Sequence, residues 1–133
     1  MLIEEKLLNS VTSKAKGSDR LRMNYNLHDN LEAKAQRLLN ALEPGTLLPV
    51  HRHRHTAETY IVLRGAIKVL FYDDNKMLTE EFMVSPQEGS YGVHIPAGQW
   101  HTLVVLESGT VIFEVKDGPY IPLQEDDLLI PRP

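Results

Sequence analysis

One stretch, residues 45–65, limits what this chain can fold into more than any other. It contains His51, His53 and Glu58, and Glu58 opens the strongly β-forming run 59–63. Side chains two residues apart leave the same face of a strand, so the two imidazoles are predicted to point the same way. If the flanking strands pair as a hairpin, Glu58 returns to the histidine face. Two imidazoles and a carboxylate suit a divalent ion such as Zn, Fe, Mn, Ni or Co, with His101 as the candidate fourth ligand.

The spacing of these residues resembles two known motifs. The first motif of the cupin superfamily has the intervals of Gly45, His51, His53, Glu58 and Gly65, and the core of the second has those of Pro96, Gly98 and His101. Ser90 and Val105 stand where the second motif often has glycine and asparagine. The resemblance implies an all-β, single-domain cupin fold, that is, a double-stranded β-helix or jelly-roll barrel. It also implies one divalent transition metal ion, held by His51, His53, Glu58 and His101.

Other stretches extend this likeness. Residues 26–28, 36–45 and 114–120 resemble the small WbuC-type cupin-fold metalloproteins, and the similarity extends over about residues 20–125. Such proteins are associated with bacterial surface-polysaccharide biosynthesis. The C-terminal run is also similar to the cupin domains of mannose-phosphate isomerizing enzymes. The resemblance is specific for fold and metal and does not identify a reaction.

Composition narrows the function classes. A length of 133 residues predicts one domain, which we divide into a helix and linker (1–19), a barrel (20–125) and a tail (126–133). The absence of cysteine excludes disulfides and thiolate ligands. A net charge of −4 offers no basic surface to nucleic acid or anionic membranes. The start lacks signal-peptide features and no run could span a membrane, so we expect a cytoplasmic protein.

Hydrophobic periodicity predicts one helix and many short strands. Apolar residues at helical spacing over 3–16 predict a helix that packs on the barrel or on a second subunit. Residues 29–43 fit helical spacing, whereas the cupin resemblance favours a strand over 36–43 after a turn near 29–34. Strands are predicted at 67–72, 77–84, 91–95, 101–106 and 110–116, and glycine- and proline-containing turns between them indicate a sandwich or barrel.

The segment 20–28 alternates strictly between polar and apolar residues, which predicts a strand. Its polar face carries Arg22, Asn24, Asn26 and His28. One interpretation is an edge strand whose polar side faces water. The other is that these groups point to the metal cavity or its mouth, which makes Arg22, Asn24 and Asn26 candidate substrate-binding residues.

Catalysis at such a site needs a general base, and His28, Lys116 and Tyr60 are the candidates. Lys116 shares one face of the predicted last strand with Glu114. Charged residues on a strand are usually solvated, and that interpretation applies to both. The likeness of 114–120 to related cupins favours the alternative, in which Lys116 reaches the cavity.

Three further residues lie beside the metal pattern. His55 sits in the loop between ligands and His94 precedes the Pro96 turn, so both are expected at the surface or behind the ligands. His55 would compete for the metal if its loop folded inward. Trp100 is expected to pack and fix the His101 loop, with stacking on a substrate as the alternative.

Residues 59–63 and 102–106 are apolar on both faces. A lone small barrel exposes one face of its sheets to water, so something is expected to cover these strands. The N-terminal helix covers part, and a second subunit would cover the rest. We therefore predict a homodimer.

Three functions remain open from the sequence. The first is a metal-dependent enzyme with isomerase- or epimerase-like chemistry on a small polar substrate, such as a sugar or sugar-nucleotide intermediate. The second is a dioxygenase, in which the site would hold Fe(II) and react with dioxygen. The third is a metal-loaded module that binds or senses a small molecule without turnover. An inert structural cupin is hard to reconcile with a complete ligand set.

Overall fold

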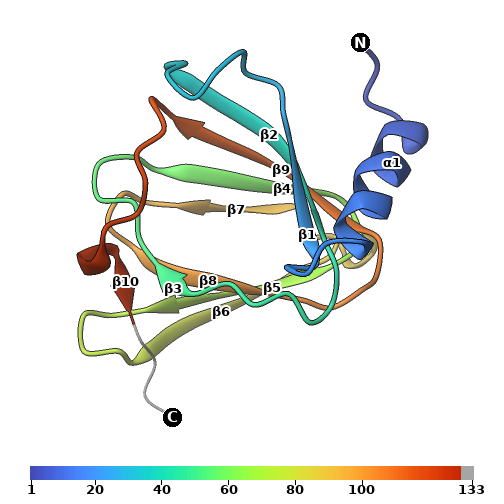
Figure 1. Ribbon diagram of the computed structural model, residues 1–133. Helices are drawn as coiled ribbons and strands as arrows, with labels where there is room; N and C mark the ends of the chain where they lie inside the picture. Colours follow the sequence, from blue (N-terminus) through green and yellow to red (C-terminus); the bar gives the residue numbers. More distant parts are fainter. Residues whose placement is uncertain (130–133) are drawn as a thin grey trace.

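The computed structural model describes residues 1–129 and contains two antiparallel sheets with one long helix outside them (Figure 1). One five-stranded sheet has the order β1-β2-β9-β4-β7, and the other has the order β10-β3-β8-β5-β6. The elements are α1 (Glu5–Lys16), β1 (Arg22–Asn26), β2 (Ala35–Leu42), β3 (Val50–His51), β4 (Glu58–Arg64), β5 (Ile67–Tyr72), β6 (Leu78–Val84), the 3₁₀ helix η1 (Pro86–Glu88), β7 (Gly92–Ile95), β8 (Trp100–Val105), β9 (Thr110–Asp117), the 3₁₀ helix η2 (Glu125–Asp127) and β10 (Leu128–Leu129). This confirms the predicted all-β domain with an external N-terminal helix.

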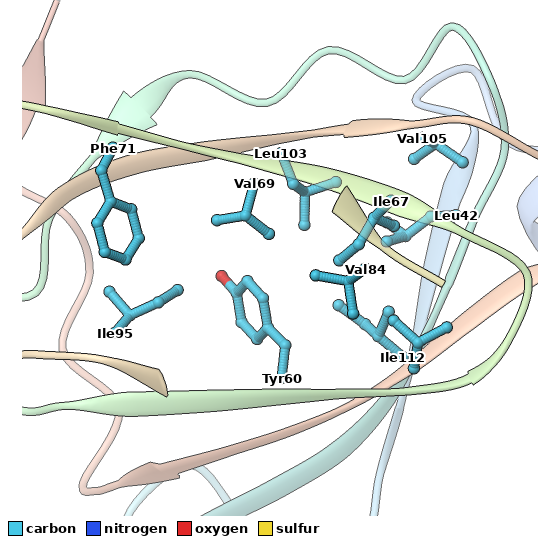
Figure 2. Packing of buried hydrophobic residues seen from close by; sticks show 11 residues of the cluster. Leu42, Tyr60, Ile67, Val69, Phe71, Val84, Ile95, Leu103, Val105 and Ile112 are labelled. Carbon is cyan, nitrogen blue, oxygen red and sulfur yellow. The ribbon is translucent and has the colours of Figure 1, made fainter. Parts of the chain in front are cut away.

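The main core lies between the two sheets. Alternate residues of each strand point inward, as Ile67, Val69 and Phe71 do on β5. They pack against inward residues of the facing sheet, among them Ile95 and Ile112 (Figure 2). Tyr60 belongs to this cluster and is 4% exposed, so its polar hydroxyl lies in the interior between the sheets.

Helix α1 covers the outer face of the β1-β2-β9 side (Figure 1). Its buried residues Leu8, Val11 and Ala15 recur at helical spacing and pack on Leu39 and Val111. Lys14 and Lys16 lie in the last turn, where positive charge is favourable. Among residues 1–129, no helix is long and apolar enough to cross a membrane.

Arg64, at the end of β4, fastens α1 to the barrel. Its guanidinium donates to Gly109 O (2.7 Å), Glu5 Oε2 (2.7 Å), Asn9 Oδ1 (2.7 Å) and Thr12 Oγ1 (3.0 Å). Replacing Arg64 by methionine keeps much of the stem and removes these bonds. We expect the free energy of unfolding in urea to fall by about 1–3 kcal/mol. Lys68→Met is the control, because Lys68 makes only a 3.9 Å exposed pair with Glu81; an equal loss there would contradict the assignment.

The strands on either side of the histidine loop do not form the hairpin that was considered from the sequence. Strand β3 pairs with β8 and β10, whereas β4 pairs with β7 and β9, so the two strands lie in opposite sheets. Strand β3 ends at His51, and His53 follows it in the loop to β4. For residues 29–43, the alternative favoured by the cupin resemblance is confirmed: turns at 28–32 lead into strand β2.

The C-terminal segment is part of the sheet structure. Residues 125–129, placed mostly in the predicted tail, form η2 and β10, and β10 pairs with β3 at Leu128↔His51 and Leu129↔Val50. Arg52 N–H donates to Asp127 O at 3.1 Å and continues this pairing. The segment therefore lies directly against the histidine-bearing strand. Residues 130–133 of the predicted tail lie outside the described residues.

Candidate metal centre

Four side chains from the two sheets converge between them. His51 of β3 and His101 of β8 come from one sheet, Glu58 of β4 from the other, and His53 from the loop after β3. One potential ligand atom of each lies within 4.8 Å of all the others. Glu58 and His101 are 4% and 1% exposed, and the two histidines from 51–53 are half-buried. These four residues form a group that could hold one metal ion.

Backbone contacts fix how the imidazoles present their nitrogens. His51 Nδ1 lies 2.9 Å from Pro49 O, and His101 Nδ1 lies 2.9 Å from Gln99 O. A carbonyl only accepts, so each Nδ1 carries a proton, and Nε2 is the ring nitrogen that is directed at the group. The His53 loop is held by the turn before β8, because Gly98 N–H donates to His53 O at 2.8 Å.

The electrostatics favour the metal-binding forms of His51, His53 and Glu58. Burial, reinforced by His101, lowers the pKa of His51 to about 4, and burial also lowers the pKa of His53. Burial alone would raise the pKa of Glu58, but its hydrogen bond and attraction to His101 outweigh this and lower the pKa to about 2. Neutral imidazoles and an ionised carboxylate are the forms that bind metals.

The donor set fits a divalent transition ion. Ligands about 2.0–2.2 Å from one ion lie at most roughly 4.4 Å apart, so a group within 4.8 Å needs only small side-chain movements. His101 Nε2 and Glu58 Oε1 lie 2.7 Å apart. Neutral imidazole and ionised carboxylate are both acceptors, so this contact requires a positive centre, a proton or a cation. Three imidazoles and one carboxylate suit Zn, Fe, Mn, Ni or Co and leave positions open for a substrate oxygen.

Of the three predicted bases, Tyr60 and Lys116 lie beside this group. The Tyr60 hydroxyl donates to Glu58 Oε1 at 2.8 Å, and burial followed by the charges of Glu58 and Glu114 raises the pKa of Tyr60 well above its ordinary value. Lys116 is the cross-strand partner of Glu58 on β9. His28 follows β1, three strand spacings from β4, or roughly 14 Å. The structure therefore does not bring His28 into contact with the ligands.

The three predicted substrate-binding residues share the inner face of β1 but not one location. Asn24 and Asn26 are exposed, whereas Met23 and Tyr25 between them pack toward α1. Arg22 pairs with the far end of β2 and donates to Thr46 Oγ1 and Leu47 O, which ties down a loop remote from the ligands. Strand β1 is the edge strand of its sheet, and its inner, polar face is exposed at Asn24 and Asn26. The structure does not bring Arg22 to the metal group.

The residues beside the metal pattern lie apart from it. His94 faces outward on β7, where its Nδ1 lies 3.0 Å from Thr59 Oγ1. His55 is exposed in the loop after His53. Trp100 packs with Val50, Leu129 and Tyr72 outside the second sheet, which agrees with the packing role expected for it.

Glu114 is a site residue whose position the sequence did not reveal. It lies across from Tyr60 on β4, and directly paired residues share a face, so Glu114 points inward. Asn40 Nδ2 donates to Glu114 Oε1 at 3.0 Å. Burial, and then the charge of Glu58, raises the pKa of Glu114 to about 7. Glu114 is two residues from Ile112, so both side chains lie on the same face of the strand. This spacing indicates an inward position only when the inner face of the strand is already known.

Glu114 should make the metal-free protein less stable at higher pH. Its folded pKa of about 7 lies above the ordinary 4.5, so its contribution is full below about pH 4.5 and is lost as pH rises through 7. Glu114→Gln lacks this titration. From pH 5 to pH 8, we expect the wild type to lose on the order of 1–3 kcal/mol of unfolding free energy relative to the variant, measured in urea with chelator. A pH-independent difference would contradict the assignment.

Known proteins share this architecture. Over 91 residues the chain is 33% identical to mannose-1-phosphate guanylyltransferase of Escherichia coli K12, covering 66% of this chain but only 16% of that enzyme. The capsular polysaccharide assembling protein CapF of Staphylococcus aureus superposes with a TM-score of 0.64 at 23% identity, over 79% of this chain and 28% of that one. The Schizosaccharomyces pombe Cnp3 cupin domain superposes with a TM-score of 0.58 at 13% identity, over 72% and 64%. At these identities the two structures establish the fold.

The sequence also matches a family directly. The family described as a domain of unknown function, DUF6016, matches residues 3–84, which is more than half of the chain. The matched region runs from α1 to the end of β6 and includes three of the four potential ligands, His51, His53 and Glu58. The chain therefore belongs to the DUF6016 family and has the cupin fold.

Proposed function

We propose that this protein is a metal-dependent enzyme with isomerase- or epimerase-like chemistry on a sugar or sugar-nucleotide intermediate of bacterial surface-polysaccharide biosynthesis. The observation that carries the proposal is the convergence of His51, His53, Glu58 and His101 within 4.8 Å between the two sheets. A divalent ion bound there would supply Lewis-acid polarisation of a substrate carbonyl or hydroxyl oxygen.

Similar proteins support the choice of a sugar. The S. aureus protein with this fold is described as assembling capsular polysaccharide, and the E. coli relative is named for mannose 1-phosphate. The likeness to WbuC-type cupins points to the same area of metabolism. Each statement concerns another protein, so the substrate of this chain is a proposal that needs a direct test.

Proton transfer is assigned to the inner face of β4 and β9. Isomerisation or epimerisation next to a carbonyl removes a proton from carbon and returns it to carbon. A group with a pKa near the working pH serves both steps, and the pKa of Glu114 is about 7. Tyr60 stays protonated and orients Glu58 through its 2.8 Å hydrogen bond. Lys116 is the other group within reach of this face.

The test combines metal analysis with isotope exchange. Protein purified without chelator should contain close to one equivalent of a divalent transition metal. Incubated in D₂O with hexose phosphates, uronates and nucleotide-linked keto sugars, it should introduce deuterium next to a carbonyl of one substrate. Glu114→Gln should lose the exchange and keep the metal. Saturable binding with no exchange would identify a binding module instead, and oxygen consumption would identify a dioxygenase.

We also propose that the protein is a homodimer. Ile61, Leu63 and Val115 lie on the outer face of the first sheet beyond α1, and each is 36–41% exposed. Val104 and Leu106 are 45% and 40% exposed at the second sheet. A second copy of the chain packed against these strands would bury the exposed apolar side chains. Sedimentation should give a dimer at micromolar concentration, and a monomer there would refute it.

A further inference from the structure

A cavity of about 370 Å³ adjoins the metal group at His53. Its walls come from three stretches of chain: the loop 52–56, the end of β9 with the residues that follow it (116–119), and the segment 121–127 that leads to β10. In Figure 1 the loop between β3 and β4 and the segment between β9 and β10 lie on the same side of the barrel. A molecule in this cavity would lie against one edge of the metal group.

Most charges around the cavity are already paired. Arg54 Nε donates to Asp127 Oδ1 at 2.6 Å, and its Nη2 lies 3.7 Å from Asp126 Oδ2. Arg52 Nε lies 3.7 Å from Asp127 Oδ1, and its guanidinium stacks 4.3 Å from the Trp100 ring centroid. Two arginines and two aspartates thus neutralise one another and form the wall rather than the binding groups.

Lys116 is the cation left over. Among residues 1–129 its ammonium group makes no hydrogen bond and no ion pair within 4.0 Å, although the residue is half-buried and its charge acts on Glu114 and His53. It shares the inner face of the first sheet with Glu58, its cross-strand partner, and with Glu114. Its neighbour Asp117 also lines the cavity and is exposed. Its Nζ lies 5.9 Å from the Tyr120 ring centroid, toward the segment that walls the cavity.

We infer that this cavity binds a monosaccharide-sized substrate carrying one carboxylate or phosphate, with the anionic group on Lys116. The inference deepens the proposed function and rests on it. An unpaired ammonium beside a partly enclosed cavity favours an oxyanion, and a charge-assisted hydrogen bond there is stronger than a neutral one. The cavity of about 370 Å³ is near the lower limit for ligand sites, roughly 300–1,000 Å³, which favours a single sugar over a nucleotide-linked one.

Calorimetry on the metal-loaded full-length protein tests the inference with four probes: glucose, glucose 6-phosphate, glucuronate and UDP-glucose. We expect glucose 6-phosphate or glucuronate to bind at least about ten-fold more tightly than glucose or UDP-glucose. Which of the two binds better identifies phosphate or carboxylate as the recognised group. Lys116→Met should lose about ten- to a hundred-fold of that affinity, and Lys116→Arg should retain part of it.

Lys68→Met is the matched control, because Lys68 lies on the other sheet and is paired with Glu81; it should bind all probes as the wild type does. Metal content and thermal unfolding of each variant show that the site and fold are intact. Equal affinity of Lys116→Met and wild type for the anionic probes would overturn the inference, as would tighter binding of UDP-glucose or no binding of any probe. Lys116-dependent binding without isotope exchange would refute the proposed enzyme but keep the site.

Discussion

Replacing His51 by alanine is expected to abolish stoichiometric metal loading. His51 supplies one of the four potential ligand atoms that come together among residues 1–129, and the 2.9 Å contact between its Nδ1 and Pro49 O orients its Nε2. Loss of a group that merely orients a ligand typically costs about 10–100-fold in metal affinity, so loss of a ligand should exceed about 100-fold. Elemental analysis after dialysis, and competition against a chromophoric chelator, would measure the loss.

His94→Ala is the matched control for this result. It also removes one imidazole, but His94 faces outward on β7 and contacts Thr59 rather than the ligands. It should keep full metal content. His101→Ala should lose metal as His51→Ala does, at an additional cost in stability, because it leaves Glu58 in the interior without its 2.7 Å partner. Full metal content in either ligand variant would show that the assigned group does not bind the ion.

The sequence predicted the elements and the ligands better than it predicted their pairing. Alternation and glycine- or proline-containing turns located most of the strands, because these signals are local. The four potential ligands were named from two spacings, and the structure brings them together. The spacing could not show that His51 and Glu58 face one another from opposite sheets, because the partners of a strand are set by contacts distant in sequence.

The sequence did not show which face of β9 points inward, nor that the C-terminal segment forms a strand, for a related reason. Glu114 and Lys116 alternate with apolar residues, and either face of such a strand could be the inner one. The register settles this, since Lys116 pairs with Glu58. Strand β10 contains only two residues, too few for a periodic pattern, and its pairing with β3 fixes the position of the cavity wall.

The largest expected loss of stability follows from Gly65→Ala. Gly65 joins β4 to β5 with a φ of +93°, which an alanine adopts at a cost of about 1 kcal/mol or more. A Cβ there would also clash with Thr110 Oγ1 and lie 2.7 Å from Thr110 Cα. Backbone cannot rotate away as a side chain can, so β4 and β9 would have to separate. We expect the free energy of unfolding in urea to fall by about 2–4 kcal/mol.

Gly89→Ala separates the two causes of this loss. Gly89 has nearly the same φ, +90°, but a Cβ there would meet nothing within 4 Å. Gly89→Ala should therefore lose only the free energy of unfolding that comes from the unfavourable φ, about 1 kcal/mol. The difference between the variants measures how closely β4 and β9 approach at Thr110. Because Glu58 and Lys116 are partners across the same pair of strands, Gly65→Ala, unlike Gly89→Ala, should also weaken metal binding. Equal losses in both variants would show that the contact with Thr110 contributes nothing.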